Sequence, residues 1–276
     1  MNLSDLYEEL VQSVFSLTCN EGSGTGFLVR ADGLILTNKH VVGVDHEIQL
    51  ESNRGASFIG KVICADRQRD LAAVRIEHGI LPHAAQPLEV GSSQDVRIGE
   101  EVLTIGHPAE SAAFSLTKGV ISAVTHVDVR KLPYLQANIS INPGNSGGPL
   151  CSASGMVVGM VRETRSNMGK RIEGLCWAIP AEAIVEFMAK IPSLDEDISH
   201  LQYCSTCGSL STRSKYCLNC GIPMESHQEQ SAVRTPRDQV KSQLAKTSCS
   251  TCEASNHSDV RYCHQCGVDL WAKSNT

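Results

Sequence analysis

A glycine-dense segment around Ser146 is the first part of the chain whose residue types could carry chemistry. Ser146 lies in Asn142 to Leu150 (NPGNSGGPL), between two apolar runs. Such a turn can present a serine hydroxyl as a nucleophile. Gly144 lacks a Cβ, so its N–H and that of Ser146 can point at one spot where a developing oxyanion would sit. A tight turn without chemistry is the alternative.

A serine nucleophile needs a base, and His40 is the histidine with the best-defined frame. It follows an apolar run within Leu36 to Val42 (LTNKHVV), where an imidazole can face a cleft from a fixed backbone. A carboxylate must then accept from the imidazole and fix its tautomer. Asp70 heads another apolar run and is the preferred candidate. Asp66 is the nearest rival, but its polar turn favours a solvated or turn-capping role.

Eight of the twelve cysteines form four Cys-x-x-Cys pairs in the last quarter of the chain. Four thiolates on two such knuckles are what tetrahedral zinc requires, and they leave no open position for catalysis. Each segment is too short for a metal-free core, so we expect two structural Zn²⁺ ions and no metal in catalysis. The expected ligands are Cys204, Cys207, Cys217 and Cys220 in the first module, and Cys249, Cys252, Cys263 and Cys266 in the second.

Two alternatives remain for these cysteines. Each module could hold two disulfides, or His257 or His264 could replace a cysteine ligand. The other four cysteines lie in apolar contexts and are expected to be small buried hydrophobes; they are Cys19, Cys64, Cys151 and Cys176.

The elements that must position these groups are mostly strands. Short apolar or alternating runs separated by Gly, Asp and Asn predict an all-β barrel or sandwich from Ser23 to about Pro180. The runs are Gly26–Val29, Leu34–Leu36, Ile59–Cys64, Leu71–Ile76, Glu101–Ile105, Gly119–Val124 and Met156–Val161. Asp32-Gly33 predicts a hairpin turn. Helical spacing predicts a short amphipathic helix near the start, capped by Ser4, and a closing helix over Ala181–Ile191.

The composition changes after Pro192, which predicts a barrel domain with appended modules. The expected boundaries are 1–191 for the barrel domain, 192–202 and 224–247 for linkers, and 203–223 and 248–271 for the two cysteine modules. The modules resemble each other in sequence, which indicates an internal duplication.

Charge and hydropathy exclude several classes of partner. The net charge of -6 gives no general attraction to nucleic acid or to an anionic membrane. No apolar run approaches the roughly 20 residues of a membrane helix. The first residues carry acids where a secretory signal needs basic residues. We therefore expect a cytoplasmic protein with neither a membrane nor a nucleic-acid partner.

Ordered blocks of the chain resemble the signature blocks of HtrA/DegP-type trypsin-like serine proteases. They are Gly22–Leu28, Ile35–Val42, Asp70–Val74, Gly119–Ala123, Ile141–Leu150 and Trp177–Pro180. The order of His40, Asp70 and Ser146 is the chymotrypsin order. The resemblance spans roughly the first 190 residues. It implies a chymotrypsin-like double β-barrel with this triad in the cleft, and a serine endopeptidase that acts on unfolded or flexible protein segments.

The same resemblance assigns substrate-binding residues. The strand near Leu175 to Ala178, which includes Trp177, should pair with the substrate backbone. Ser140 should lie near the floor of the P1 pocket. No carboxylate occupies that floor, so a small or medium apolar P1 residue is expected.

The chain departs from the family in its C-terminal part, where cysteine modules resembling double zinc ribbons replace the PDZ domain. We expect the ribbons to recruit a protein partner or substrate; a plain spacer is the alternative. A homo-oligomer is left open, because trimerisation is common in the family but the N-terminal extension here is short.

Two competing functions remain from the sequence. One is a latent or inactive protease-fold scaffold with the ribbons as recognition modules. The other is a zinc-dependent redox or nucleic-acid module with a passenger barrel, which only the cysteines support.

Overall fold

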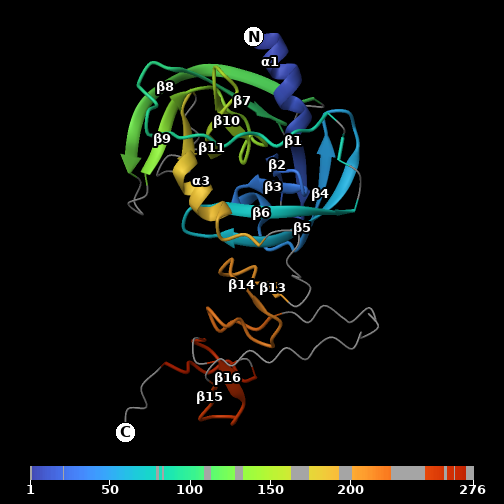
Figure 1. Cartoon of the computed structure of the whole chain (residues 1–276), viewed down its shortest axis with the longest axis vertical. Helices are drawn as coiled ribbons and strands as arrows, with labels where there is room; N and C mark the ends of the chain where they lie inside the picture. Colours follow the sequence, from blue (N-terminus) through green and yellow to red (C-terminus); the bar gives the residue numbers. More distant parts are fainter. Residues whose placement is uncertain are drawn as a thin grey trace. The chain divides into compact units, whose positions relative to one another are not determined.

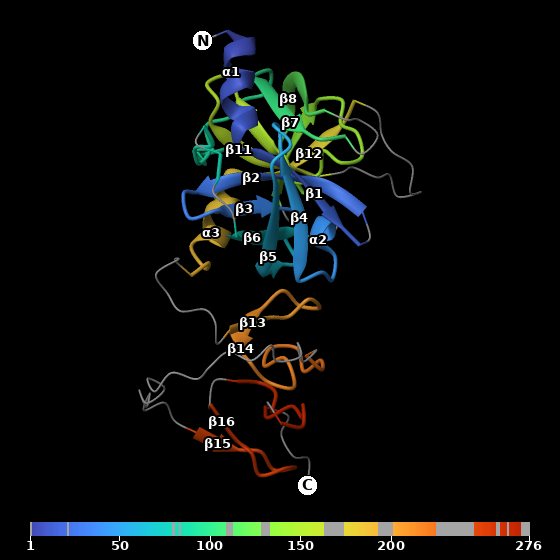
Figure 2. The ribbon, with the colours of Figure 1, turned by 90° about the vertical axis from the view of Figure 1, so that its right-hand side faces the viewer.

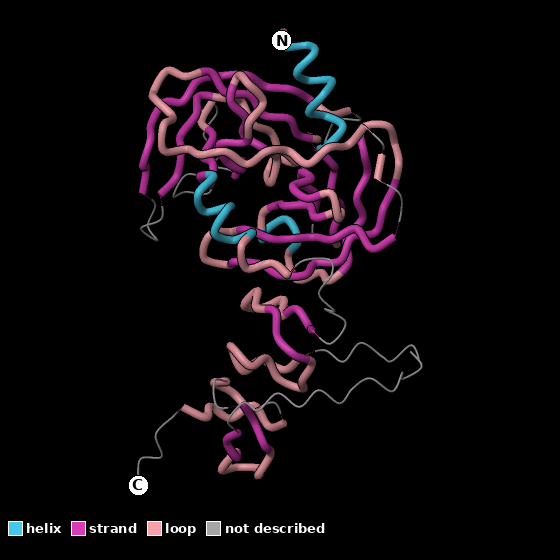
Figure 3. Tube along the Cα trace, in the orientation of Figure 1, coloured by secondary structure: helices cyan, strands magenta, loops and turns pink. Residues whose placement is uncertain are grey.

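The computed structural model describes residues 2–20, 22–78, 81–82, 84–108, 113–127, 133–162, 174–192, 201–224, 246–257, 260–263 and 265–271. The chain divides into two units, Met1–Asp197 and Ile198–Thr276, which are described separately. Strands dominate the first unit, as Figures 1 and 3 show. The finer predicted boundaries of the linkers and modules stay predictions.

Two closed barrels of six strands each form the first unit, and within each barrel neighbouring strands are antiparallel. The first has the order β1-β2-β3-β6-β5-β4 and the second β10-β11-β12-β9-β8-β7. The first comprises β1 (Val14–Cys19), β2 (Gly22–Arg30), β3 (Leu34–Thr37), β4 (Glu47–Ser52), β5 (Ser57–Asp66) and β6 (Leu71–His78). The second comprises β7 (Glu101–Gly106), β8 (Ser115–Val127), β9 (Pro133–Asn138), β10 (Pro149–Ser152), β11 (Val157–Arg162) and β12 (Cys176–Pro180). The predicted chymotrypsin-like double barrel is confirmed.

Alternating side chains fill the barrels. Along β4 exposed and buried residues alternate, so that Ile48 and Leu50 point inward. Phe15 of β1 meets Phe58 of β5 edge to face, with ring centroids 5.9 Å apart. Burying a side chain of this size contributes about 1.5–3 kcal/mol. The packed side chains therefore hold the strands of each barrel together.

The helices are short, as Figure 2 shows. They are α1 (Leu3–Leu10), the 3-10 turn η1 (Val11–Ser13), α2 (Lys39–Val42) and α3 (Ala181–Met188). The predicted Ser4 cap is wrong, because Asn2 Oδ1 accepts from the Asp5 N–H at 2.9 Å and caps α1. The predicted closing helix forms, but it ends at Met188 rather than Ile191. None of the helices in the described ranges is long and apolar enough to cross a membrane.

Three of the four cysteines outside the two cysteine modules are buried as expected, namely Cys64, Cys151 and Cys176. Burial raises the pKa of each of these thiols to about 12, so they are inert as nucleophiles. Cys19 differs from the expectation, because it is only partly buried.

The second unit contains two small hairpins, each next to a group of four cysteines. They pair β13 (Leu201–Tyr203) with β14 (Leu210–Thr212), and β15 (Lys246–Ser248) with β16 (Ser255–His257). The two halves also contact each other reciprocally. A Cβ on Gly221 would lie 2.8 Å from the Tyr262 ring, and one on Gly267 would lie 2.7 Å from the Tyr216 ring. The duplicated sequence thus gives a duplicated contact.

Candidate active site

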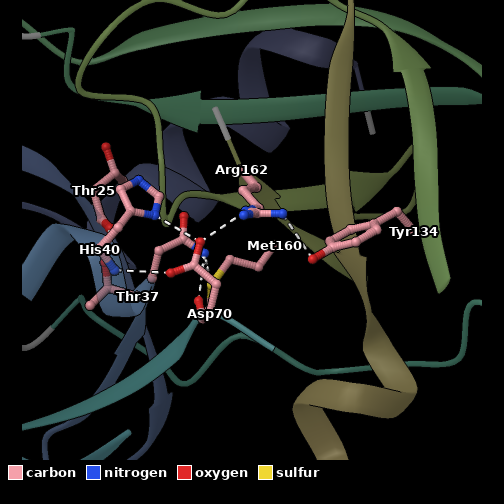
Figure 4. Close-up of polar contacts among 8 residues, drawn as sticks. Thr25, Thr37, His40, Asp70, Tyr134, Met160 and Arg162 are labelled. Atoms are coloured by element: carbon pink, nitrogen blue, oxygen red, sulfur yellow. Dashed lines mark hydrogen bonds and ion pairs between the residues drawn. The ribbon is translucent and has the colours of Figure 1, made fainter. Parts of the chain in front are cut away.

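Asp70 and His40 come together in the first barrel, as Figure 4 shows. His40 Nδ1 lies 2.7 Å from Asp70 Oδ2, and Asp70 Oδ1 accepts from the His40 backbone N–H at 2.9 Å. The Asp70 side chain is 8% exposed and the His40 side chain 43%. One carboxylate therefore fixes both the ring and the backbone of His40, while the ring still reaches solvent. The rival Asp66 instead accepts from the Arg69 N–H at 2.9 Å and caps its own turn.

The backbone of Asp70 is held in the left-handed region, at φ 62°. Such a conformation costs a non-glycine residue of order 1–3 kcal/mol and persists only when its surroundings impose it. Here the Asp70 carbonyl accepts from the Lys39 N–H at 3.1 Å and from Asn38 Nδ2 at 3.0 Å. These contacts lock the turn before β6 onto the start of α2, and so fix Asp70 relative to His40.

The electrostatics keep Asp70 ionised. Burial alone would raise the pKa of the Asp70 carboxyl. The hydrogen bonds from His40 and the charges of His40 and Arg162 outweigh burial and hold this pKa below its usual range. A buried carboxylate can thus act as a permanent acceptor for the imidazole.

Arg162 and Tyr134 complete the surroundings of Asp70, and the sequence reasoning did not single them out. Arg162 Nε donates to Asp70 Oδ2 at 2.9 Å, and Arg162 Nη1 donates to the Tyr134 hydroxyl at 2.9 Å. Arg162 follows the predicted run Met156–Val161, and a charged residue directly after a buried apolar run is the one signal that could have marked it. Its partner Asp70 lies in the other barrel, and no sequence pattern links the two.

Ser146 lies in a loop that begins with a tight turn. The Asn145 N–H donates to the Asn142 carbonyl at 3.0 Å, and Gly144 has φ 95°. Proline in the second position and a left-handed glycine in the third define a type II turn. Ser146 itself is 7% exposed. Its carbonyl accepts from the Thr25 N–H at 2.8 Å, so β2 fixes the backbone at this residue.

Thr25 links this loop to the first barrel. Its hydroxyl donates to the Gly144 carbonyl at 2.6 Å and accepts from the His107 N–H at 3.0 Å. Thr37 Oγ1 donates to the Thr25 carbonyl at 2.7 Å. A Cβ on Gly147 would clash with Thr25 and Thr37 and would lie 3.1 Å from the Asn38 backbone N. The loop around Ser146 therefore packs directly on the segment that leads to His40.

The residues predicted to bind substrate lie in two different parts of the second barrel. Ser140 is exposed just after β9. Trp177 and Ala178 lie in β12, which pairs with β11 on one side and with β9 on the other. The predicted pairing of their backbone with a substrate is therefore wrong, because both edges of the strand are already occupied. The roles of Ser140 and of the two side chains in a P1 pocket stay predictions.

A separate cavity of about 440 Å³ lies between β9, β12 and α3. It is lined by Tyr134, Leu135, Ile179 and Ala183, among others, and His40 and Ser146 are not part of its lining. This cavity is therefore separate from the pair of His40 and Asp70, although Tyr134 forms part of its wall.

The eight cysteines of the two modules form two groups that could hold a metal ion, and within each group the four Sγ atoms lie within 4.8 Å of one another. Cys204 and Cys220 are 3.8 Å apart, and the pairs Cys207–Cys217, Cys249–Cys266 and Cys252–Cys263 are each 3.6 Å apart. A tetrahedral ion with metal–sulfur bonds of about 2.3 Å requires sulfur separations of about 3.8 Å. A disulfide requires about 2.05 Å. The donors and their spacing fit a four-thiolate metal site and not the disulfide alternative.

Comparison with known proteins gives a consistent result for the double barrel. Residues 24–160 match the family described as a trypsin-like peptidase domain. Serine protease HTRA1A of Danio rerio is 35% identical over 192 residues, which cover 67% of this chain and 38% of that protein. A probable periplasmic serine endoprotease DegP-like of Halomonas elongata is 35% identical over 165 residues, which cover 59% of this chain and 34% of that protein. The matched part thus spans little more than a third of these relatives.

A solved structure has the same architecture. The HtrA-type protease AlgW, determined with a tripeptide, superposes with a TM-score of 0.62 at 28% sequence identity. The match covers 69% of this chain and 64% of that one.

Proposed function

We infer that this chain, whose double-barrel domain belongs to the HtrA-like trypsin-type serine proteases, hydrolyses peptide bonds in unfolded or flexible protein segments with Ser146, His40 and Asp70 as its triad. The observation that carries the proposal is the 2.7 Å contact of His40 Nδ1 with Asp70 Oδ2. It leaves Nε2 as the ring nitrogen that is free to act as a base. The tripeptide present with AlgW supports a peptide substrate by analogy.

In this mechanism the Ser146 hydroxyl attacks the scissile carbonyl while His40 Nε2 takes its proton. His40 then gives the proton to the leaving amine, and a water molecule hydrolyses the acyl-enzyme by the same steps. Asp70 stays ionised throughout, keeps the proton of the imidazole on Nδ1 and stabilises the imidazolium. The lowered pKa of Asp70 supports this role.

The N–H groups of Gly144 and Ser146 are proposed as the oxyanion hole. The type II turn supports this assignment, because the turn type sets the direction of the Gly144 N–H. In a type I turn the Pro143–Gly144 peptide would be rotated by roughly 180°, and this N–H would point the opposite way. The bond from Thr25 Oγ1 to the Gly144 carbonyl holds the next peptide in place. Loss of one such donor costs about 100- to 1,000-fold in rate.

The test is labelling with a fluorophosphonate probe together with a casein-degradation assay. Wild type should be labelled and should cleave casein, and Ser146→Ala should do neither, because the probe reacts only with an activated serine. Ser154→Ala is the matched control, since Ser154 is exposed and lies in the turn after β10. It should behave as wild type.

The alternative is a protease-fold scaffold without turnover. A folded protein that is not labelled, and that behaves identically in the Ser146→Ala form, would favour it. The ordered contacts of the Ser146 loop favour the enzyme.

The metal of the ribbons is proposed to be Zn²⁺, one ion per ribbon. Four thiolate donors without a carboxylate or an open position suit structural zinc. The ion would supply folding energy of about 10–16 kcal/mol to segments too small for a core of their own. No step of peptide hydrolysis involves it.

The ribbons are further proposed to recruit a protein partner or substrate, and the chain to be cytoplasmic. The proposed four-thiolate metal sites support the location, since thiolate ligands persist where disulfides are rare. Fractionation of cells that express the chain would test the location, and recovery in a periplasmic or secreted fraction would contradict it.

A further inference from the structure

Arg162 contacts the same carboxylate oxygen as the proposed base. Arg162 Nε and His40 Nδ1 lie 2.9 Å and 2.7 Å from Asp70 Oδ2. The side chains of Asp70 and Arg162 are 8% and 19% exposed, so solvent screens the ion pair only weakly. A carboxylate oxygen offers about two lone-pair sites, and these two donors occupy both of them.

Tyr134 holds the guanidinium in this position, as Figure 4 shows. Its hydroxyl accepts from Arg162 Nη1, and the guanidinium carbon lies 5.4 Å from the centre of the Tyr134 ring. Tyr134 is 1% exposed and stacks on Trp177, with centroids 5.9 Å apart. Trp177 lies directly opposite Arg162 in the pairing of β11 with β12. The second barrel thus presents a fixed cation to a carboxylate of the first.

Other nearby charges are directed elsewhere. Within the described ranges, His40 and Arg162 are the charged groups that act on the Asp70 carboxylate. Arg69, the neighbour of Asp70 in the chain, pairs with Asp66 and Glu186. Lys39 donates its ammonium to the Gly43 carbonyl. Besides His40 itself, Arg162 is therefore the main group that offsets the negative charge of the Asp70 carboxylate.

We propose that Arg162 is a positioning residue of the catalytic site: anchored by Tyr134, it fixes the Asp70 carboxylate against His40 and offsets part of its negative charge. The inference rests on the proposed function, in which His40 is the base. An aspartate without this cation would favour the protonated imidazole, which cannot accept the serine proton. Arg162 would thereby extend activity toward lower pH.

The test is the rate of fluorophosphonate labelling of the full chain between about pH 5 and pH 9. In Arg162→Thr the acidic limb of the profile should move to higher pH by about one unit, because the offsetting charge is gone. Arg162→Lys should keep the limb near its wild-type position but react more slowly, since an ammonium lacks the fork that reaches both Asp70 and Tyr134. Arg54→Thr removes the same charge from an exposed turn and should reproduce the wild-type profile.

An unmoved limb in folded Arg162→Thr would overturn the inference and leave Arg162 a packing residue. If Arg162→Thr does not fold, the variant Tyr134→Phe is tested in its place. This variant removes only the anchoring hydroxyl, and it should lower the maximal labelling rate without moving the limb. A wild-type rate in Tyr134→Phe would equally overturn the inference.

Failure of the proposed function can be told apart from failure of this inference. If wild type is never labelled, ¹⁵N-labelled Ser146→Ala protein with and without Arg162→Thr gives a readout without turnover. The His40 ring signals should change from the neutral to the charged pattern at a higher pH when Arg162 is absent. The same midpoint in both proteins would overturn the inference.

Discussion

At the scale of single residues, Asp70 is the most constrained group of the site. Its carboxylate contacts His40 and Arg162, its carbonyl accepts from Lys39 and Asn38, and its backbone is left-handed. The strain is local, whereas the contacts that impose it come from more than one segment of the chain. Such over-determination is typical of functional positions.

Asp70 should therefore stabilise the fold in a pH-dependent way. Its pKa in the folded state lies below the unfolded value of about 3.9. The stabilisation by the ionised carboxylate is thus present above that value and lost as the pH falls through the folded pKa. Urea unfolding should show Asp70→Asn less stable than wild type by about 1–3 kcal/mol at pH 7 and by clearly less at pH 3.

Asp66→Asn is the control for this prediction, because Asp66 caps a turn and does not touch His40. A stability difference between wild type and Asp70→Asn that is the same at both pH values would contradict the prediction.

At the scale of elements, the site depends on how closely the Ser146 loop approaches β2 and β3. Gly147 has φ 86°, and its N–H donates to the Val161 carbonyl of β11 at 2.9 Å. The opposite side of the same residue faces Thr25 and Thr37. One residue is thus fixed between the two barrels, and it leaves no space for a side chain.

Gly147→Ala should therefore cost more than backbone strain alone. A left-handed alanine costs about 1–2 kcal/mol. The clash with the Thr25 carbonyl and Thr37 hydroxyl should add about 1–3 kcal/mol, since it can be relieved only by moving the loop. Denaturant unfolding should show a free energy of unfolding lowered by the sum of these two costs. The rate of fluorophosphonate labelling of Ser146 should also fall.

Gly99→Ala is a matched control. Gly99 has φ 93°, but a Cβ there would have nothing within 4 Å. It should show only the backbone cost and should keep labelling. Equal losses in the two variants would mean that packing at Gly147 does not position the site.

At the scale of the whole molecule, the chain combines a unit proposed to be catalytic with a unit proposed to bind metal. The first unit has its own two barrel cores, while the second has small hairpins, two cysteine groups and the reciprocal contacts of Tyr216 with Gly267 and of Tyr262 with Gly221. Since metal ligands supply the folding energy of such small modules, the two units should respond differently to loss of metal.

Cys204→Ser should lower the zinc content from about two ions per chain to about one, because three ligands hold a structural ion weakly. Fluorophosphonate labelling should stay at the wild-type level, since the expected metal ligands all lie outside the barrels. Casein cleavage should fall if the ribbons recruit substrate. Elemental analysis, labelling and casein cleavage separate these effects.

Cys19→Ser is the control, because Cys19 lies in β1 outside both cysteine groups. It should keep zinc and activity. Full casein cleavage in Cys204→Ser would favour the spacer over recruitment, and lost labelling would show that the ribbons support the catalytic unit itself.

The sequence by itself determined the all-β class, the hairpin at Asp32-Gly33 and the grouping of the cysteines, because these depend on local periodicity, turn chemistry and ligand spacing. The choice of a double barrel over a sandwich came from the family resemblance. It did not reveal β1 or β4. The VFSLTC of β1 follows directly on a helical pattern, and the EIQLES of β4 alternates but contains only two apolar residues.

Only the tertiary structure decided how the segments meet. It brought Asp70 rather than Asp66 to His40, placed β12 between two strands and set Arg162 of one barrel on Asp70 of the other. The physical reason is that each of these contacts joins residues that are distant in the chain, within one closed barrel or between the two. The register of the strands fixes them, and a single sequence carries no local signal of that register.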